Sequence, residues 1–115
     1  MTITRLQPGK RMSQAVKHGN TVYLAGQVAT DYNGTIEKQT TEVLAAIDKL
    51  LAEAGTSKSK VLSCQVILNN IGDFAAMNSV YDAWIDPQRP PARACVEARL
   101  ADPDLRVEMS AIAAL

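Results

Sequence analysis

The chain has 115 residues, of which 47% are hydrophobic, and its 12 basic and 12 acidic side chains cancel. This length and apolar content are typical of one globular domain, residues 1–115, which needs no disulfide or metal to fold. The balanced charge argues against nucleic acid and membrane surfaces as partners, because both are anionic and attract basic chains.

No charged leader precedes an apolar run, and no apolar stretch approaches the roughly 18 residues of a membrane span, so we expect a cytoplasmic protein. Cys64 and Cys95 lie far apart without CxxC spacing, which is typical of reduced strand residues, although the sequence leaves their pairing open. With His18 as the one histidine and no clustered thiols, we expect no transition-metal site.

The first part of the chain predicts strands. Residues 2–6 suggest a short first strand. Residues 14–17 and 21–25 are candidate strands, in which Val22 and Leu24 alternate with polar or amphipathic neighbours. Gly19-Asn20 between them can take positive φ in a tight turn. We therefore expect a β-hairpin here.

The middle of the chain predicts helix, strand and helix. Residues 37–54 carry an apolar stripe at helical spacing, and Gly55 follows where a C-terminal cap belongs. Residues 60–68 form a nearly continuous apolar strand, which suggests burial on more than one side. Asp73 is a candidate N-cap for a second helix over residues 74–85.

The last part predicts two strands, residues 93–100 and 105–113, joined by a turn at residues 101–104. The expected order is β-β-α-β-α-β-β, with a possible extra strand at the start. This order predicts an α+β fold with one mixed sheet and two helices packed on one face. In so short a chain, strands this apolar predict a partner subunit on the other face.

The segment Arg89-Pro-Pro-Ala-Arg93-Ala-Cys-Val-Glu97 is the best candidate for a binding site. The prolines favour an extended backbone, and the planar guanidinium of Arg93 fits a carboxylate in bidentate fashion. This pattern favours a small-carboxylate site. The alternative is a solvated arginine, or one that pairs with an internal Asp or Glu.

Four further residues are candidates, each with a plain structural alternative. Glu108 would hold or activate a water near Arg93, or would point to solvent as an ordinary strand residue. Gly26 would let a ligand approach the backbone closely. Asn78 would bind the ligand, or would be a surface residue of a helix in which Met77, Tyr81 and Trp84 form the core side. Cys95 shares the strand face of Arg93 but has no histidine beside it, so its side chain is interpreted as packing.

These motifs together resemble a known family. Arg93 to Glu97 followed by Arg106-Val-Glu-Met109 resembles the C-terminal signature of the reactive-intermediate deaminases, the RidA or YjgF-type family. Residues 19–27 resemble the early hairpin of that family, and residues 74–81 resemble its second helix. The resemblance is in register from about residue 13 to residue 113.

The resemblance implies a chorismate-mutase-like fold and a homotrimer with a central barrel and sites at its interfaces. It also implies that Arg93 clamps the substrate carboxylate and that Glu108 positions water. Asn78, Gly26 and the backbone amide of Cys95 would complete the binding site, with no cofactor.

The activity it implies is hydrolysis of enamine/imine intermediates of the 2-iminobutanoate and 2-iminopropanoate type to 2-keto acids and ammonia. Many family members carry a tyrosine where this chain has Met12 or Ser13, and a serine where it has Ala25. Loss of these hydroxyl groups leaves two alternatives open: a non-catalytic protein that binds or senses a small carboxylate such as a 2-keto acid, and a different hydrolase acting on a carbamate or amide-like metabolite.

Overall fold

The computed structural model describes residues 1–115 and begins with three antiparallel strands. β1 (Ile3–Pro8) pairs with β2 (Ser13–His18), and β2 pairs with β3 (Thr21–Leu24). Gly19, in the turn between β2 and β3, has φ 61°, a left-handed conformation that glycine adopts without strain. The predicted hairpin is confirmed, and the short first strand is present.

The first helix, α1 (Ile36–Ala54), begins and ends at the residues that the sequence favours. The Thr35 hydroxyl accepts a hydrogen bond from the Lys38 amide at 3.2 Å, which satisfies one of the free donors of the first turn. Gly55 ends the helix with φ 89°.

The second helix, α2 (Phe74–Trp84), is present, and Asp73 occupies its N-cap position as expected. The Asp73 side chain makes no capping hydrogen bond to the helix. A 3₁₀ turn (Ile71–Asp73) leads into α2, and the side-chain oxygen of Asn70 caps this turn by accepting a hydrogen bond from the Gly72 amide at 2.8 Å.

Three later strands complete a six-stranded sheet in the order β1-β2-β3-β6-β4-β5. They are β4 (Val61–Leu68), β5 (Ala92–Glu97) and β6 (Val107–Ala114). β5 runs parallel to β4 after the crossover through α2, and the other pairs are antiparallel. The turn expected at residues 101–104 is present between the last two strands, but these strands are not neighbours in the sheet, because β4 lies between them.

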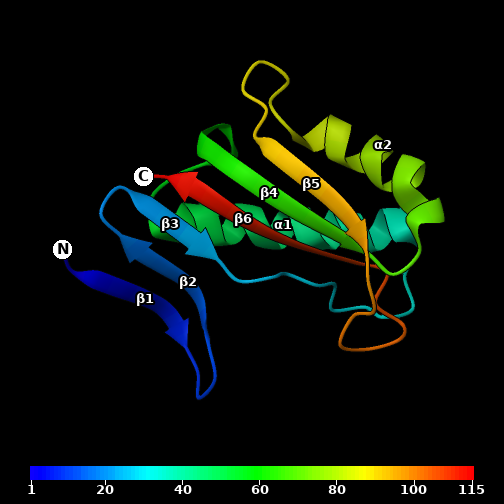
Figure 1. Cartoon of the computed structure of the whole chain (residues 1–115), viewed down its shortest axis with the longest axis horizontal. Helices are drawn as coiled ribbons and strands as arrows, with labels where there is room; N and C mark the ends of the chain where they lie inside the picture. Colours follow the sequence, from blue (N-terminus) through cyan, green and yellow to red (C-terminus); the bar gives the residue numbers. More distant parts are fainter.

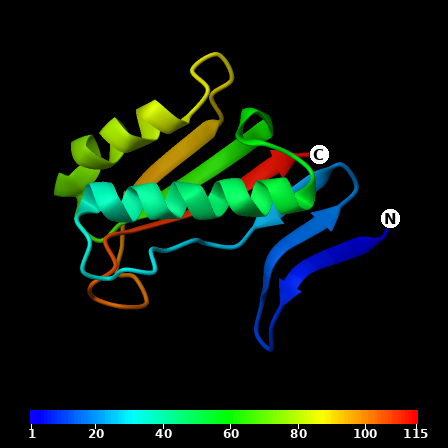
Figure 2. The ribbon, with the colours of Figure 1, turned by 180° about the vertical axis from the view of Figure 1, so that it is seen from behind.

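Both helices lie on the same face of the sheet, as the two opposite views show (Figures 1 and 2). On this helix-covered face, every second residue of β4 and β6 is buried in the core. These residues are Cys64, Val66, Leu68, Val107, Met109, Ala111 and Ala113. The expected fold class, an α+β domain with a mixed sheet and two helices on one face, is confirmed.

The opposite side, which we call the open face, carries no helix. Tyr23, Val96 and Ile112 lie on it and are 46%, 44% and 36% exposed. The apolar sequence of β4 predicted burial on more than one side. Within a single chain, β4 is buried on one face only.

Neither helix combines the length and hydropathy that a membrane span requires.

Candidate functional site

Arg93 is the second residue of β5, and its side chain lies against α2. Its Nη1 donates a hydrogen bond to Asn78 Oδ1 at 2.8 Å. The guanidinium carbon lies 4.7 Å from the ring centroid of Tyr81 and 5.8 Å from that of Phe74. No Asp or Glu forms an ion pair with Arg93, so an internal acid partner, one of the simpler alternatives, is absent.

The contacts of Arg93 come from one side of α2. Phe74, Asn78 and Tyr81 stand four and three residues apart, which places them along one helix face. Aromatic faces attract a guanidinium, and the amide oxygen between them fixes its rotation. From the sequence we interpreted Tyr81 as a core residue only, and we did not identify Phe74 as a site residue. Both lie four or three residues from Asn78, and this helical spacing is the signal that could have identified them.

These contacts use one edge of the guanidinium and leave another free. Nε and Nη2 have no hydrogen-bond partner within the chain. Two parallel donors of this kind are the geometry that binds a carboxylate in bidentate fashion. The side chain is half-buried, and an anion that reached it would meet an oriented, unneutralised cation.

The two cysteines lie near this arginine and are both free. Burial raises the pKa of the Cys64 thiol to about 11, although the charge of Arg93 partly opposes this shift. Burial also raises the pKa of Cys95, again against the effect of Arg93. Both side chains are therefore thiols at neutral pH, which does not suit a nucleophile.

Glu108 lies elsewhere, beside Gly26. The backbones of Gln27 and Met109 exchange two hydrogen bonds, at 2.8 and 3.1 Å, which bring the residue before Gln27 against the start of β6. A Cβ at position 26 would overlap the Glu108 carboxylate. The absence of a side chain at Gly26 thus makes room for Glu108 itself.

The strand register separates Arg93 from Glu108. Arg93 pairs with Cys64, whereas Glu108 pairs with Ile67, three residues further along β4. Residues an odd number apart on a strand point to opposite faces, so Arg93 lies on the helix-covered face and Glu108 on the open face. The two are also separated by roughly 10 Å along the strands and roughly 10 Å across them.

One chain therefore carries two separate groups of candidate residues. Arg93, Asn78 and Cys95 form the arginine half-site, and Glu108 and Gly26 form the glutamate half-site. Within a single chain the sheet stands between Glu108 and Arg93, so a site that contains both needs the subunit interface implied by the resemblance, and this expectation stays a prediction.

Comparison with known proteins matches nearly the whole chain to one family. The family model described as Endoribonuclease L-PSP matches residues 2–115. A RutC family protein from Haemophilus influenzae is 47% identical, and the match covers 98% of each chain. The RutC family protein YoaB from Escherichia coli is 38% identical over 100% of both chains.

Solved structures agree with the sequence matches. A member of the YjgF protein family from Neisseria meningitidis is similar with a TM-score of 0.96 and 45% identity, covering 99% of this chain and 95% of that one. Yeast Mmf1 is similar with a TM-score of 0.91 and 28% identity, covering 98% of both chains. The chain belongs to the YjgF/RutC family, whose sequence model is named for endoribonuclease L-PSP.

Proposed function

We propose that the protein is an enamine/imine deaminase that hydrolyses short 2-imino acids, such as the tautomers of 2-aminoacrylate, to 2-keto acids and ammonia. The observation that carries this proposal is the state of Arg93. Asn78 and two aromatic rings hold its guanidinium, no acid neutralises it, and Nε and Nη2 remain free. Such a group suits a small carboxylate ligand. Two free thiols, Cys64 and Cys95, fit a cytoplasmic enzyme.

The proposed chemistry needs one positioned acid–base group and no cofactor. The imine carbon is already electrophilic, so a water can add to it directly. The imine reacts in its protonated, iminium form. Glu108 accepts a proton from the attacking water as the water oxygen bonds to the carbon, which gives a neutral tetrahedral carbinolamine. Glu108 then returns this proton to the nitrogen, and the C–N bond breaks as the C=O bond forms. The freed carboxylate takes the hydroxyl proton and passes it to the departing ammonia, which leaves as ammonium.

A complete site under this proposal requires two copies of the chain. The two half-sites lie on opposite faces of one sheet, so one copy cannot bring both to a small substrate. A neighbouring copy packed on the open face would bury Tyr23, Val96 and Ile112, and would bring the glutamate half-site of one chain to the arginine half-site of the next. Three copies in a closed ring would give three such sites, consistent with a homotrimer.

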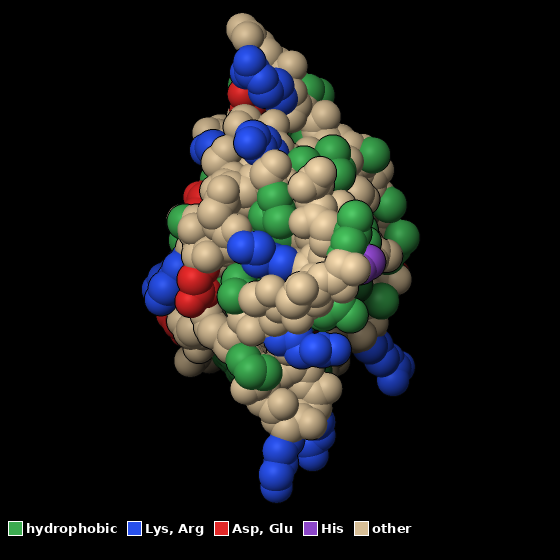
Figure 3. Space-filling model, turned by 90° about the vertical axis from the view of Figure 1, so that its left-hand side faces the viewer, with side chains coloured by type: hydrophobic (Ala, Val, Ile, Leu, Met, Phe, Trp, Pro, Cys, Tyr) green, Lys and Arg blue, Asp and Glu red, His purple; other side chains and the backbone are tan.

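The name of the family model raises ribonuclease activity as another reading. RNA binding is driven by basic surfaces that neutralise phosphates. This chain has a formal net charge of zero, and on the side shown in Figure 3 the Lys and Arg side chains lie in separate spots with other side chains between them. We therefore favour a small-molecule substrate over nucleic acid.

A specific feature supports the non-catalytic alternative. Many family members carry a tyrosine where this chain has Met12 or Ser13 and a serine where it has Ala25, so the phenol and one serine hydroxyl are missing; Met12 is 50% exposed at the turn between β1 and β2. A site without these hydroxyls could hold a 2-keto acid through Arg93 without turning over an imine. The two functions differ in whether ammonia is released.

The deciding experiment generates 2-imino acids in situ and measures ammonia and keto-acid release, with wild type, Arg93→Ala and Arg93→Lys. We expect Arg93→Ala to weaken substrate affinity about tenfold or more, since a hydrogen-bonded charge pair contributes about 1.5–3 kcal/mol. Arg93→Lys should rescue poorly because the planar fork is lost. Arg99→Ala, at an exposed arginine that forms no ion pair, is the matched control.

Failure of the wild type to accelerate hydrolysis of any imine, with retained pyruvate binding, would support the binding function instead. Light scattering that reports a monomer at micromolar concentration would contradict the shared site.

A further inference from the structure

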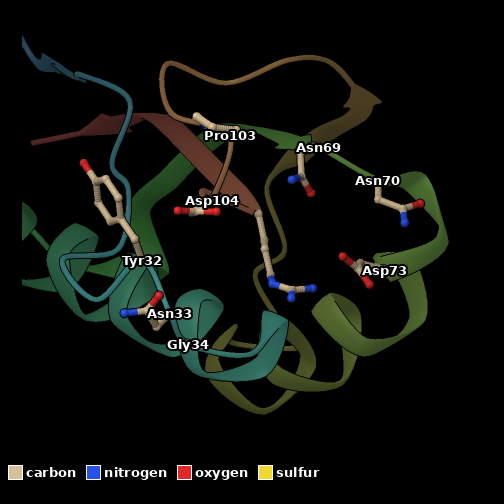
Figure 4. Close-up of a pocket in the computed structure, with 9 residues that line it drawn as sticks. Tyr32, Asn33, Gly34, Asn69, Asn70, Asp73, Pro103 and Asp104 are labelled. Atoms are coloured by element: carbon tan, nitrogen blue, oxygen red, sulfur yellow. The ribbon is translucent and has the colours of Figure 1, made fainter.

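A polar hollow of about 350 Å³ lies at the end of the sheet where β4 stops and β6 starts, near the beginning of both helices. Figure 4 shows Asn69, Asn70 and Asp73 on one side of it, and Asn33 and Asp104 on the other. Arg106, just before β6, also lines it. None of these residues belongs to either half-site of the proposed deaminase.

The charged side chains around the hollow have no partners within the chain. Arg106, Asp73 and Asp104 make no side-chain hydrogen bond and no ion pair, although one guanidinium and two carboxylates line the same space. The rim of the hollow therefore carries both signs of charge without an ion pair between them.

A buried glutamine holds together the backbone segments that carry these side chains. Gln39 of α1 is 0% exposed, and its Nε2 donates to the backbone oxygens of Gly34 at 3.3 Å and Asp104 at 3.1 Å. Its Oε1 accepts from the Arg106 amide at 2.9 Å, and the Arg106 oxygen accepts from the Asn69 amide at 3.1 Å. Three chain segments are thus tied together at the backbone, while their side chains stay free to bind something else.

The charge pattern selects the ligand. A plain anion would meet Arg106 but also two carboxylates, and a plain cation would meet the carboxylates but also the guanidinium. A small molecule that carries both charges satisfies all three groups. The side-chain amides of Asn33 and Asn69 have no partner within the chain either, and they add donors and acceptors for a polar substituent.

We propose that this hollow binds a free α-amino acid with a small polar side chain. Its carboxylate pairs with Arg106, its ammonium group lies between Asp73 and Asp104, and its side chain meets the amides. The site is separate from the proposed active site and does not depend on deaminase activity.

The test is a titration of ¹⁵N-labelled protein with L-asparagine, followed through the backbone amide shifts. It is performed in the Arg93→Ala background so that binding at the proposed active site does not contribute. Acetate and ethylammonium, at the same ionic strength, test each charge alone. Arg106→Gln and Asp73→Asn remove one partner each, and Arg99→Gln is the matched control outside this hollow.

We expect saturable shifts at the amides of Asn33, Asn70 and Asp104 with L-asparagine, and no saturation with acetate or ethylammonium. Arg106→Gln should weaken binding about tenfold or more, because a charge-assisted contact is lost, while Arg99→Gln should bind like its parent. Absence of saturable shifts, equal shifts with acetate, or unchanged binding in Arg106→Gln would each overturn the proposal.

Discussion

On the helix-covered face, β4 and β6 bury Val66, Leu68 and Met109 completely, whereas on the open face β3 and β6 leave Tyr23 46% exposed and Ile112 36% exposed. The first face is closed by α1 and α2 of the same chain (Figure 2). The second has nothing of this chain to cover it. This open face mixes apolar side chains such as Tyr23 and Ile112 with polar ones such as Gln65 and Ser110, and under the proposed function another subunit covers it.

The polar residues follow the same division. Arg93 lies on the closed face, where Asn78 orients it, and Glu108 lies on the open face, where Gly26 makes room for it. Arg93 forms no ion pair in its own chain, and Glu108 of the same chain lies on the other face of the sheet. Under the proposed function, the fold therefore prepares two halves of a site on opposite faces of one sheet, and a second copy of the chain brings them together.

The largest effect is expected at Glu108. Glu108→Gln keeps the size and a hydrogen bond but cannot carry a proton, so kcat for imine hydrolysis should fall about 100- to 10,000-fold. Pyruvate binding should remain near that of the wild type, because Arg93 is unchanged. Glu37→Gln, at an exposed carboxylate in the first turn of α1, is the control. Full activity in Glu108→Gln would make Glu108 an ordinary strand residue.

A somewhat smaller loss is expected from Gly26→Ala. The added Cβ overlaps the Glu108 carboxylate, so this side chain must move. Displacement of a catalytic group by about 1 Å costs on the order of 100-fold in rate. The control is Gly9→Ala, where the nearest atom to a new Cβ is the Met12 oxygen at 3.5 Å. Steady-state kinetics and the melting temperature of both variants decide whether rate or fold is lost.

A moderate effect is expected at Tyr81, on the closed face. Tyr81→Leu removes the ring under Arg93 and should weaken pyruvate binding several-fold, since a cation–π contact contributes about 0.5–2 kcal/mol. Tyr81→Phe keeps the ring and should bind pyruvate like the wild type. Calorimetric titration of both variants, with thermal unfolding to monitor the core, measures this. Equal losses in the two would show that the hydroxyl group, not the ring, matters.

The smallest effect is expected at the thiols. Cys95→Ser should keep most of the activity, because we assign ligand binding to the backbone amide of residue 95. With its pKa raised to about 11, Cys64 should be slow toward iodoacetamide at neutral pH and should react faster as the pH rises. Mass spectrometry of alkylated protein at several pH values follows this. Rapid alkylation of Cys64 at pH 7 would contradict the burial that raises its pKa.

Local sequence signals predicted most of the elements but not their pairing. The apolar stripe and Gly55 predicted α1, and Gly19-Asn20 predicted the hairpin, because each signal lies within the element it specifies. The parallel pairing of β4 with β5 was missed. It depends on contacts across α2, and the turn residues before β6 gave no indication that another strand intervenes.

The candidate site was predicted to a similar extent. The resemblance identified Arg93 and Glu108 as candidate residues, and each half-site contains one of them. The resemblance implied a site at a subunit interface, but the sequence did not predict that Arg93 and Glu108 lie on opposite faces of the sheet. The face that a residue occupies depends on how its strand is paired, and the pairing was unknown. The ring of Tyr81 was missed because a buried aromatic residue on an amphipathic helix is normally core.

The most direct test of the shared site mixes two inactive variants. Arg93→Ala and Glu108→Gln chains are denatured together in equal amounts and refolded, and mixed trimers are verified by native mass spectrometry. If each site takes Arg93 from one copy and Glu108 from its neighbour, every mixed trimer contains one intact site, and the mixture should recover about a quarter of the wild-type activity. If mixed trimers form but activity stays at the level of the separate variants, the two residues do not meet across a subunit interface, and the shared site is ruled out.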